Sequence, residues 1–167
     1  MKPSHLLPLV PLVPLVAAVD MTPYKPSPDV DAAFAAFVEE YYLTSEDKNA
    51  TTTFTDFWPA DNGQLIIAGR TFSGSAAMLG VKQSLLPPAG NKSWWHLIRG
   101  ASVAGESGES KTFVADIVIQ TTGNASFTIL KDEQGSPRLE PHSGSLSVYN
   151  LTVSTTDSPT DIPCSSS

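Results

Sequence analysis

The sequence has little cysteine and little positive charge. Cys164 is the only cysteine, so no disulfide can form within the chain and a hydrophobic core must hold the fold. Lys and Arg number 10 against 17 Asp and Glu, and they form no run, which argues against nucleic-acid and anionic-membrane partners. Cys164 lies in a Ser-rich end without a neighbouring base, so we expect an inert thiol.

Motifs for metals, nucleotides and organic cofactors are missing as well. The sequence contains no His-x-His, no His-Glu-x-x-His and no cysteine cluster that would bind zinc. It has no glycine-rich phosphate loop, because Gly-Glu-Ser-Gly-Glu-Ser at 105–110 fits a hairpin turn instead. We therefore expect neither a metal nor a cofactor.

The first 18 residues have the features of a secretory signal. Lys2 supplies a positive start, residues 6–16 are apolar, and Val16-Ala17-Ala18 offers a cleavage site of small residues. The apolar run is too short to span a membrane as a helix and contains helix-breaking prolines. We expect cleavage after Ala18, secretion of the remainder and no membrane partner after cleavage.

Glycosylation sequons support the same destination. Four of the five asparagines lie in Asn-x-Ser/Thr patterns, an enrichment that favours export through a eukaryotic secretory pathway. A glycosylated asparagine must be accessible, so all four are predicted at the surface. The predicted N-glycosylation sites are Asn49, Asn91, Asn124 and Asn150.

The rest of the chain has the length of one domain. Residues 19–28, with three prolines, predict an extended leader, and residues 154–167, rich in Ser, Thr and Pro, predict a disordered tail. Helix patterns cover 28–43, a single turn at 54–58, and 75–86. Strand patterns cover 64–70, 93–104, 111–121, 126–131, 138–141 and 145–153.

Helices grouped before antiparallel strands predict an α+β domain. In such a domain the helices pack on a curved, mainly antiparallel sheet, and an apolar hollow between them can hold a small ligand. Residues 93–100, Ser-Trp-Trp-His-Leu-Ile-Arg-Gly, are the best place to look for it. Strand alternation puts Trp94, His96 and Ile98 on one face, predicted to point inward, and their neighbours on the other.

Five segments together resemble the nuclear transport factor 2-like superfamily. Within it, residues 29–153 are most similar to SnoaL-like and scytalone-dehydratase-like proteins and to small secreted fungal members. The resemblance implies a cone-shaped α+β barrel whose enzymes dehydrate, isomerise or cyclise small carbonyl compounds without a cofactor. The segments are Phe-Val-Glu-Glu-Tyr-Tyr at 37–42, Phe-Thr-Asp-Phe-Trp at 54–58, residues 69–72, Gly-Val-Lys-Gln-Ser-Leu-Leu at 80–86 and Trp-His-Leu-Ile-Arg-Gly at 95–100.

His96 resembles a pocket histidine of scytalone dehydratase, which implies a role as base or hydrogen-bond donor. The charged partners of that histidine have no counterpart here, because Tyr41 and the region 119–121 stand at the nearest positions. We therefore expect a lone imidazole without an orienting carboxylate, and Asp116 is expected to face outward. The predicted ligand-binding residues are Tyr41, Tyr42, Asp56, Trp58, Trp94, His96 and Ile98.

Three functional hypotheses follow, and enzyme activity stays open among them. The first is a secreted, glycosylated protein that binds a small, mostly apolar or aromatic molecule in a cone-shaped pocket. The second is a cofactor-free lyase or isomerase that uses His96. The third is a secreted interaction protein with a filled cone, which forms a homodimer through the open face of its sheet.

Overall fold

The computed structural model describes residues 19–91, 93–119 and 122–153, so the predicted signal and tail lie outside it. Within these described residues, eight strands form one sheet and three helices accompany it. The strands are β1 (Val19–Asp20), β2 (Lys25–Pro26), β3 (Gln64–Ile67), β4 (Arg70–Ser73), β5 (His96–Glu106), β6 (Ser110–Val118), β7 (Thr122–Leu130) and β8 (Leu146–Val153). The helices are α1 (Phe34–Glu46), α2 (Thr52–Thr55) and α3 (Ser75–Leu85).

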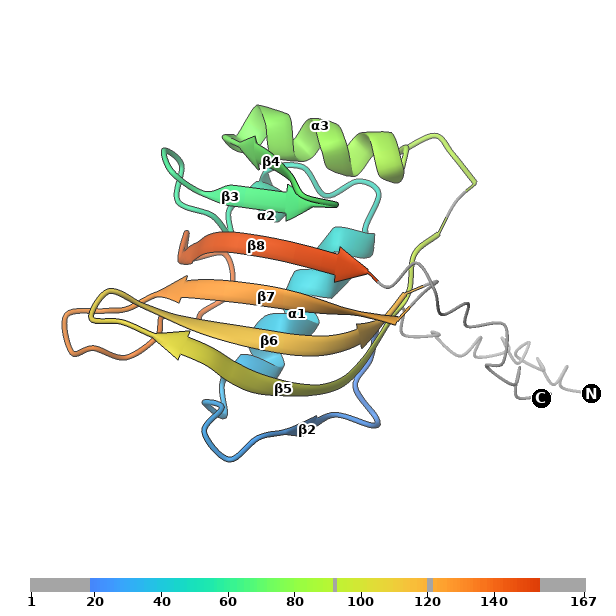
Figure 1. Ribbon diagram of the computed structural model, residues 1–167. Coiled ribbons are helices and arrows are strands. Elements are labelled where there is room, and N and C mark those ends of the chain that lie inside the picture. Colours follow the sequence, from blue (N-terminus) through green and yellow to red (C-terminus); the bar gives the residue numbers. More distant parts are fainter. Residues whose placement is uncertain (1–18, 92, 120–121, 154–167) are drawn as a thin grey trace, which may run out of the picture.

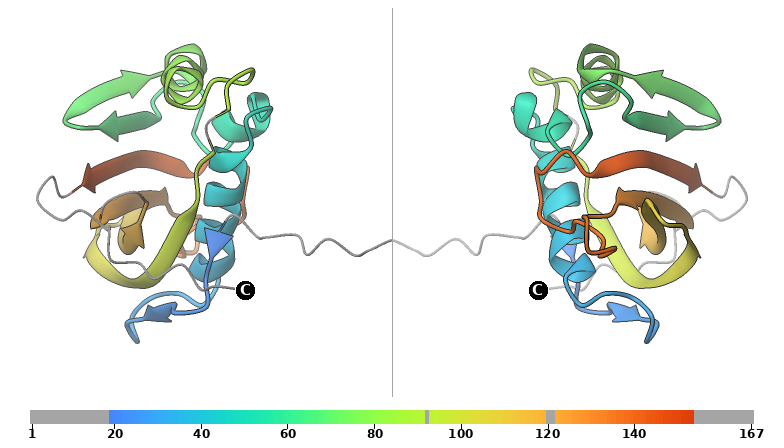
Figure 2. Two further views of the ribbon diagram at one scale, coloured as in Figure 1. Left: turned by 90° about the vertical axis from the view of Figure 1, so that its right-hand side faces the viewer. Right: turned by 90° about the vertical axis from the view of Figure 1, so that its left-hand side faces the viewer.

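The sheet has the order β1-β5-β6-β7-β8-β3-β4, and β2 also pairs with β5. Strands β5 to β8 form the antiparallel meander that the sequence predicts, whereas β1, β2 and β3 join it in parallel. The sheet curls around α1, and α3 lies beside the β3–β4 hairpin (Figures 1 and 2). The predicted α+β class, with helices on a curved and mainly antiparallel sheet, is confirmed.

Aromatic residues of α1 build the core on the concave face of the sheet. The Phe34 ring stacks on Phe113 of β6 with 4.3 Å between centroids, and Phe37 meets Phe127 of β7 edge-on at 6.3 Å. All four rings are fully buried. Alternation along β6 and β7 therefore sends every second side chain inward, as the period-two pattern predicts.

No helix among the described residues is long and apolar enough to cross a membrane.

Helix α1 starts later than its sequence pattern predicts. The pattern places an N-cap at Ser27 and a first turn at Pro28, but the helix runs from Phe34 to Glu46. The backbone N–H of Ser27 donates to the carbonyl of Ala101 on β5, so pairing with the sheet keeps this segment extended. Within the predicted leader, residues 19–28, the short strands β1 and β2 belong to the sheet and a turn separates them.

Two strand predictions differ from the structure. The predicted strand 64–70 is the first half of a hairpin, because Ala68 and Gly69 both have positive φ and reverse the chain between β3 and β4. The predicted strand 138–141 is absent from the described residues, where only an isolated bridge joins Lys131 to Pro137. The predicted helix 75–86 and the strands at 93–104 and 145–153 are confirmed within about three residues. Strand β7 begins four residues before the predicted start at 126, and residues 120 and 121 of the predicted strand 111–121 lie outside the described residues.

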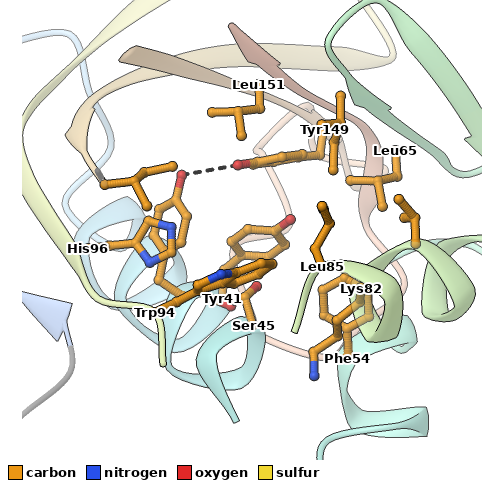
Figure 3. Close-up of a pocket in the computed structure, with 14 residues that line it drawn as sticks. Tyr41, Ser45, Phe54, Leu65, Lys82, Leu85, Trp94, His96, Tyr149 and Leu151 are labelled. Atoms are coloured by element: carbon orange, nitrogen blue, oxygen red, sulfur yellow. Dashed lines mark hydrogen bonds between the residues drawn. The ribbon is translucent and has the colours of Figure 1, made fainter. Parts of the chain in front are cut away.

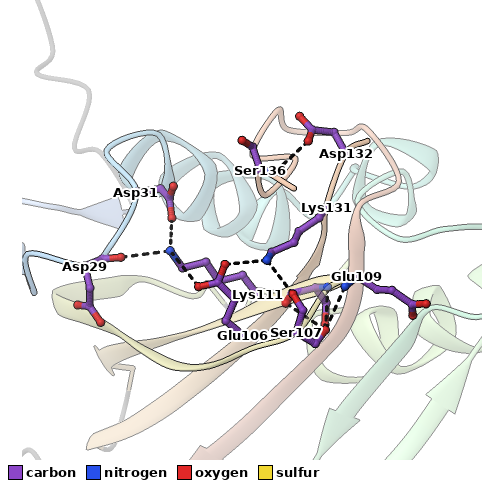
Figure 4. Close-up of polar contacts among 10 residues, drawn as sticks. Asp29, Asp31, Glu106, Ser107, Glu109, Lys111, Lys131, Asp132 and Ser136 are labelled. Atoms are coloured by element: carbon purple, nitrogen blue, oxygen red, sulfur yellow. Dashed lines mark hydrogen bonds and ion pairs between the residues drawn. The ribbon is translucent and has the colours of Figure 1, made fainter. Parts of the chain in front are cut away.

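Ion pairs connect the β5–β6 hairpin to the segment that precedes α1 (Figure 4). Lys111 Nζ lies 2.8 Å from Asp31 Oδ2, and Lys131 Nζ lies 2.7 Å from Glu106 Oε1. The hydrogen bond from Lys131 holds the pKa of Glu106 below its usual value, and the hydrogen bond to Asp31 raises the pKa of Lys111. The cluster fixes the end of the sheet that lies farthest from His96.

The close approach of β2 to β5 requires a glycine at position 100. A Cβ at Gly100 would lie 2.8 Å from the carbonyl oxygen of Lys25, whereas a Cβ at Gly105 of the same strand would meet nothing within 4 Å. We expect Gly100→Ala to lower the free energy of unfolding by about 1–3 kcal/mol, and Gly105→Ala to change it by less than about 1 kcal/mol. Denaturant unfolding followed by circular dichroism measures both. Equal effects would contradict the close packing of β2 on β5.

Candidate functional site

A cavity of about 200 Å³ lies between α1, α3 and the concave face of the sheet. Aliphatic and aromatic side chains make up most of its wall, and the polar ones are few. Figure 3 shows His96 and Trp94 on one side of it and Leu65 and Leu85 on the opposite side. The wall consists of Tyr41, Tyr42, Ser45, Phe54, Leu65, Ile67, Val81, Lys82, Leu85, Trp94, His96, Ile119, Tyr149 and Leu151.

His96 has a carboxylate partner that the sequence analysis missed. Its Nδ1 atom lies 2.6 Å from Oε1 of Glu46, and the two side chains are only 5% and 4% exposed. Glu46 is the last residue of α1, three residues beyond the predicted end of the helix at Leu43. The expectation of a lone imidazole is therefore wrong. The spacing of Glu46 four residues after Tyr42 was the available signal, because such residues share a helix face.

Tyr42 and Glu46 together fix the orientation of the imidazole. The Tyr42 ring stacks on the His96 ring with 4.2 Å between centroids and 26° between planes. One helical turn later, Glu46 reaches the edge of the same ring. The end of α1 continues to Glu46 although Ser45 is a poor helix former, and Ser45 Oγ donates to the carbonyl of Tyr41 at 2.7 Å.

The pair determines which nitrogen of His96 can react. An ionised carboxylate only accepts hydrogen bonds, so beside ionised Glu46 the proton of a neutral imidazole belongs on Nδ1. Nε2 then presents a lone pair, and no described residue hydrogen-bonds to it. The other oxygen of Glu46, Oε2, is buried and has no hydrogen-bond partner in the part of the chain that the structure describes. Nε2 of His96 can therefore accept a proton, and the Glu46 carboxylate can stabilise the positive charge that results on the imidazole.

Three tyrosines add hydroxyl groups to the same cavity. Tyr42 Oη and Tyr149 Oη lie 3.4 Å apart, a long contact in which either can donate. Burial raises the pKa of Tyr149 to about 12 and raises the pKa values of Tyr41 and Tyr42 well above the ordinary value for tyrosine. All three hydroxyls therefore stay protonated near neutral pH and can donate to a carbonyl oxygen or an oxyanion.

Lys82 is a buried cation in the wall of the cavity, and its ammonium group has a structural role. Its Nζ donates to the carbonyl oxygens of Asp47 at 2.6 Å and Ala50 at 3.2 Å, and it lies 5.5 Å from the centre of the Phe54 ring. Burial lowers the pKa of Lys82. In Figure 3 the ammonium group points away from His96, so its alkyl stem forms the wall while its charge holds the α1–α2 connection to α3.

The structure brings four of the seven predicted ligand-binding residues to the cavity: Tyr41, Tyr42, Trp94 and His96. The other three are placed elsewhere. Asp56 is exposed, while Trp58 and Ile98 are buried in the core without bordering the cavity. Strand alternation around His96 holds, since His96 and Ile98 are buried and Arg99 pairs with Asp116 at 2.8 Å on the outer side.

A second hollow lies on the other side of α1, between α1 and α2, and has a volume of about 340 Å³. It contains His142, whose Nδ1 lies 2.9 Å from the carbonyl of Thr53 and whose Nε2 lies 3.4 Å from Glu40 Oε1. Both side chains are about one third or more exposed, so water screens the pair. Among the residues that the structure describes, no group of three or more His, Cys, Asp and Glu could hold a metal ion.

Solved structures with similar folds exist, although no protein-family profile and no curated protein matches the chain by sequence. A candidate ketosteroid isomerase from Shewanella frigidimarina aligns with a TM-score of 0.50 and 13% identity, over 74% of this chain and 98% of that chain. A nuclear transport factor 2-like protein of unknown function from Pseudomonas aeruginosa aligns with a TM-score of 0.53 and 10% identity, over 73% and 98%. The chain has the nuclear transport factor 2-like fold, as its sequence segments indicate.

Loss of the Glu46 carboxylate should destabilise the protein because His96 Nδ1 would be buried without a partner. We expect Glu46→Ala to lower the free energy of unfolding by about 2 kcal/mol. Glu46→Gln should keep most of the wild-type stability, because its amide oxygen can still accept the hydrogen bond from Nδ1. Glu39→Ala, at an exposed position of the same helix, is the matched control and should change it by less than about 0.5 kcal/mol. If Glu46→Ala unfolds like Glu39→Ala in urea, the buried pair does not form.

Proposed function

We propose that this protein binds a small, mostly apolar molecule that carries one oxygen-containing group. The observation that carries the proposal is the cavity of about 200 Å³, with apolar residues such as Leu65 and Leu85 facing a polar side made by His96 and the tyrosines. An apolar chamber with a few convergent polar groups is the usual form of a ligand site. The cavity argues against the filled cone of the third hypothesis, because Phe34 and Phe37 pack beside β6 and β7 and leave this space open.

The volume restricts the size of the ligand. A buried apolar cavity of about 150 Å³ accommodates a single benzene ring. A cavity of about 200 Å³ therefore suits a molecule of roughly six to ten non-hydrogen atoms. A monocyclic phenol or ketone meets both requirements, since its ring would contact the aliphatic wall and its oxygen would reach the Tyr42 and Tyr149 hydroxyls. The signal and the sequons support action outside the cell, which we include in the proposal.

Binding can be tested with p-cresol, a monocyclic phenol of this size. Val81→Trp on α3 would fill the cavity, whereas Leu43→Trp, on an exposed position of α1 outside this cavity, would not. By isothermal titration calorimetry we expect wild type and Leu43→Trp to bind alike and Val81→Trp to bind at least about tenfold more weakly. Equal binding by all three proteins would exclude the cavity as the site. Native mass spectrometry of secreted protein would then identify any molecule that co-purifies.

A second candidate function is proton transfer next to a carbonyl group, and the 2.6 Å contact between His96 and Glu46 favours it. Nε2 of His96 would take a proton from the carbon beside the carbonyl, and Glu46 would stabilise the imidazolium through Nδ1–H. A tyrosine hydroxyl would donate to the enolate oxygen, and return of the proton would regenerate His96. The distant fold relatives establish no activity for this chain, so the candidate rests on this geometry.

Deuterium exchange into cyclohexanone tests proton transfer directly. We expect wild-type protein in D₂O to accelerate exchange of the protons beside the carbonyl, and His96→Gln to lower that acceleration by about 100-fold. Glu46→Gln should lower it less, because the amide can still orient the ring. Nuclear magnetic resonance measures the rates, with the blocked variant Val81→Trp as control. If wild type exchanges no faster than Val81→Trp, the catalytic candidate is wrong while the binding proposal stands.

A further inference from the structure

Two of the four sequons lie side by side on the outer face of the sheet. In the pairing of β7 with β8, Asn124 stands opposite Thr152 and Ser126 stands opposite Asn150. Each asparagine is therefore directly across from the hydroxyl residue of the other sequon. Ala125, which follows Asn124, and Tyr149, which precedes Asn150, are buried on the concave side, so strand alternation directs both asparagines outward.

We propose that the outer face of the sheet carries two adjacent N-glycans, on Asn124 and Asn150, and that they exclude protein partners from this face. Asparagines in this diagonal register lie about 7–8 Å apart. Two sugar chains can leave the sheet side by side at this spacing, but no protein surface can pack between them. Asn124 is exposed and Asn150 is half-buried, so both side chains reach the surface.

The composition of the outer face supports the proposal. The aromatic residues of β6 to β8, Phe113, Phe127 and Tyr149, all lie on the concave side. The outer face instead presents a Thr112–Thr128 hydroxyl pair at 2.9 Å and the Arg99–Asp116 ion pair, whose side chains are 43% and 46% exposed. Protein interfaces favour aromatic residues at their centre, and a face rich in small hydroxyl and amide groups is poorly suited to one.

This proposal replaces the homodimer through the sheet that the sequence analysis considered. It does not depend on the proposed function, since the cavity opens on the other side of the sheet. It does depend on export, because sequons are modified only in the secretory pathway. The remaining sequons provide an internal comparison: Asn49 and Asn91 lie on exposed loops, which a hydrogen bond from Lys48 Nζ to the carbonyl of Gly90 holds together at 2.7 Å.

The test is expression of the full chain, with its own predicted signal, in a eukaryotic host, followed by glycopeptide mapping of the secreted protein. Ser126→Ala and Thr152→Ala each remove one sequon while they keep both asparagines. We expect each variant to lose the mass of one glycan, at Asn124 and Asn150 respectively, and the double variant to lose both. Thr51→Ala, which removes the sequon of Asn49, is the control and should leave modification of the sheet unchanged.

Light scattering of the glycosylated protein tests the exclusion of partners. Val114 is paired with Ser126 on the outer face, so Val114→Arg would break any dimer that uses this face. We expect wild type and Val114→Arg to have the same molecular mass. The proposal is overturned if either Asn124 or Asn150 is unmodified in the secreted protein, or if the wild-type chain stays inside the host cell and carries no glycan. It is also overturned if Val114→Arg converts a wild-type dimer into a monomer.

Discussion

Burial of the aromatic side of α1 against the concave face of the sheet is the constraint on which the candidate site depends. Phe34 and Phe37 fill the space next to β6 and β7 and thereby fix the rotation of the helix. With that rotation set, the next residues on the same side are Tyr41 and Tyr42, followed one turn later by Glu46. Their polar ends meet His96 and Tyr149 where the helix and sheet leave room for a cavity. The hydrophobic core and the polar site are thus consecutive parts of one helix face.

The inward set of β5 could be predicted because alternation along a strand is a local rule, and the aromatic spacing in α1 follows an equally local period. The partner of His96 was harder to predict, because the spacing from Tyr42 to Glu46 identifies it only if α1 extends as far as Glu46. Leu43, Thr44 and Ser45 interrupt the apolar pattern, and only contact with the sheet shows that the helix continues to Glu46. Asp56 and Trp58 were predicted to bind the ligand but do not border the cavity. The directions of their side chains depend on the tertiary contacts of a short helical turn, which the sequence pattern does not contain.

Burial of the His96–Glu46 pair costs free energy of desolvation, which apolar core residues at the same positions would not cost. A carboxylate removed from water is unfavourable unless its oxygens are satisfied, and Oε2 of Glu46 has no hydrogen-bond partner among the described residues. Substitution of both residues by apolar ones would remove that cost. His96 of this pair lies in the wall of the cavity, and the proposed proton transfer uses the pair there, whereas the proposed binding uses the Tyr42 and Tyr149 hydroxyls.

Strand β5 has 11 residues, and its free edge is covered by only two short parallel strands from the start of the described chain. A long uncovered strand edge is a template for pairing with another chain. Residues 19–26 therefore cover part of this edge of β5 and reduce its tendency to pair with another chain. Loss of these residues would expose the edge of β5 and would also remove Val19, a buried residue that pairs with His96 in the sheet. The start of the described chain therefore bears on both the colloidal stability of the protein and the position of His96.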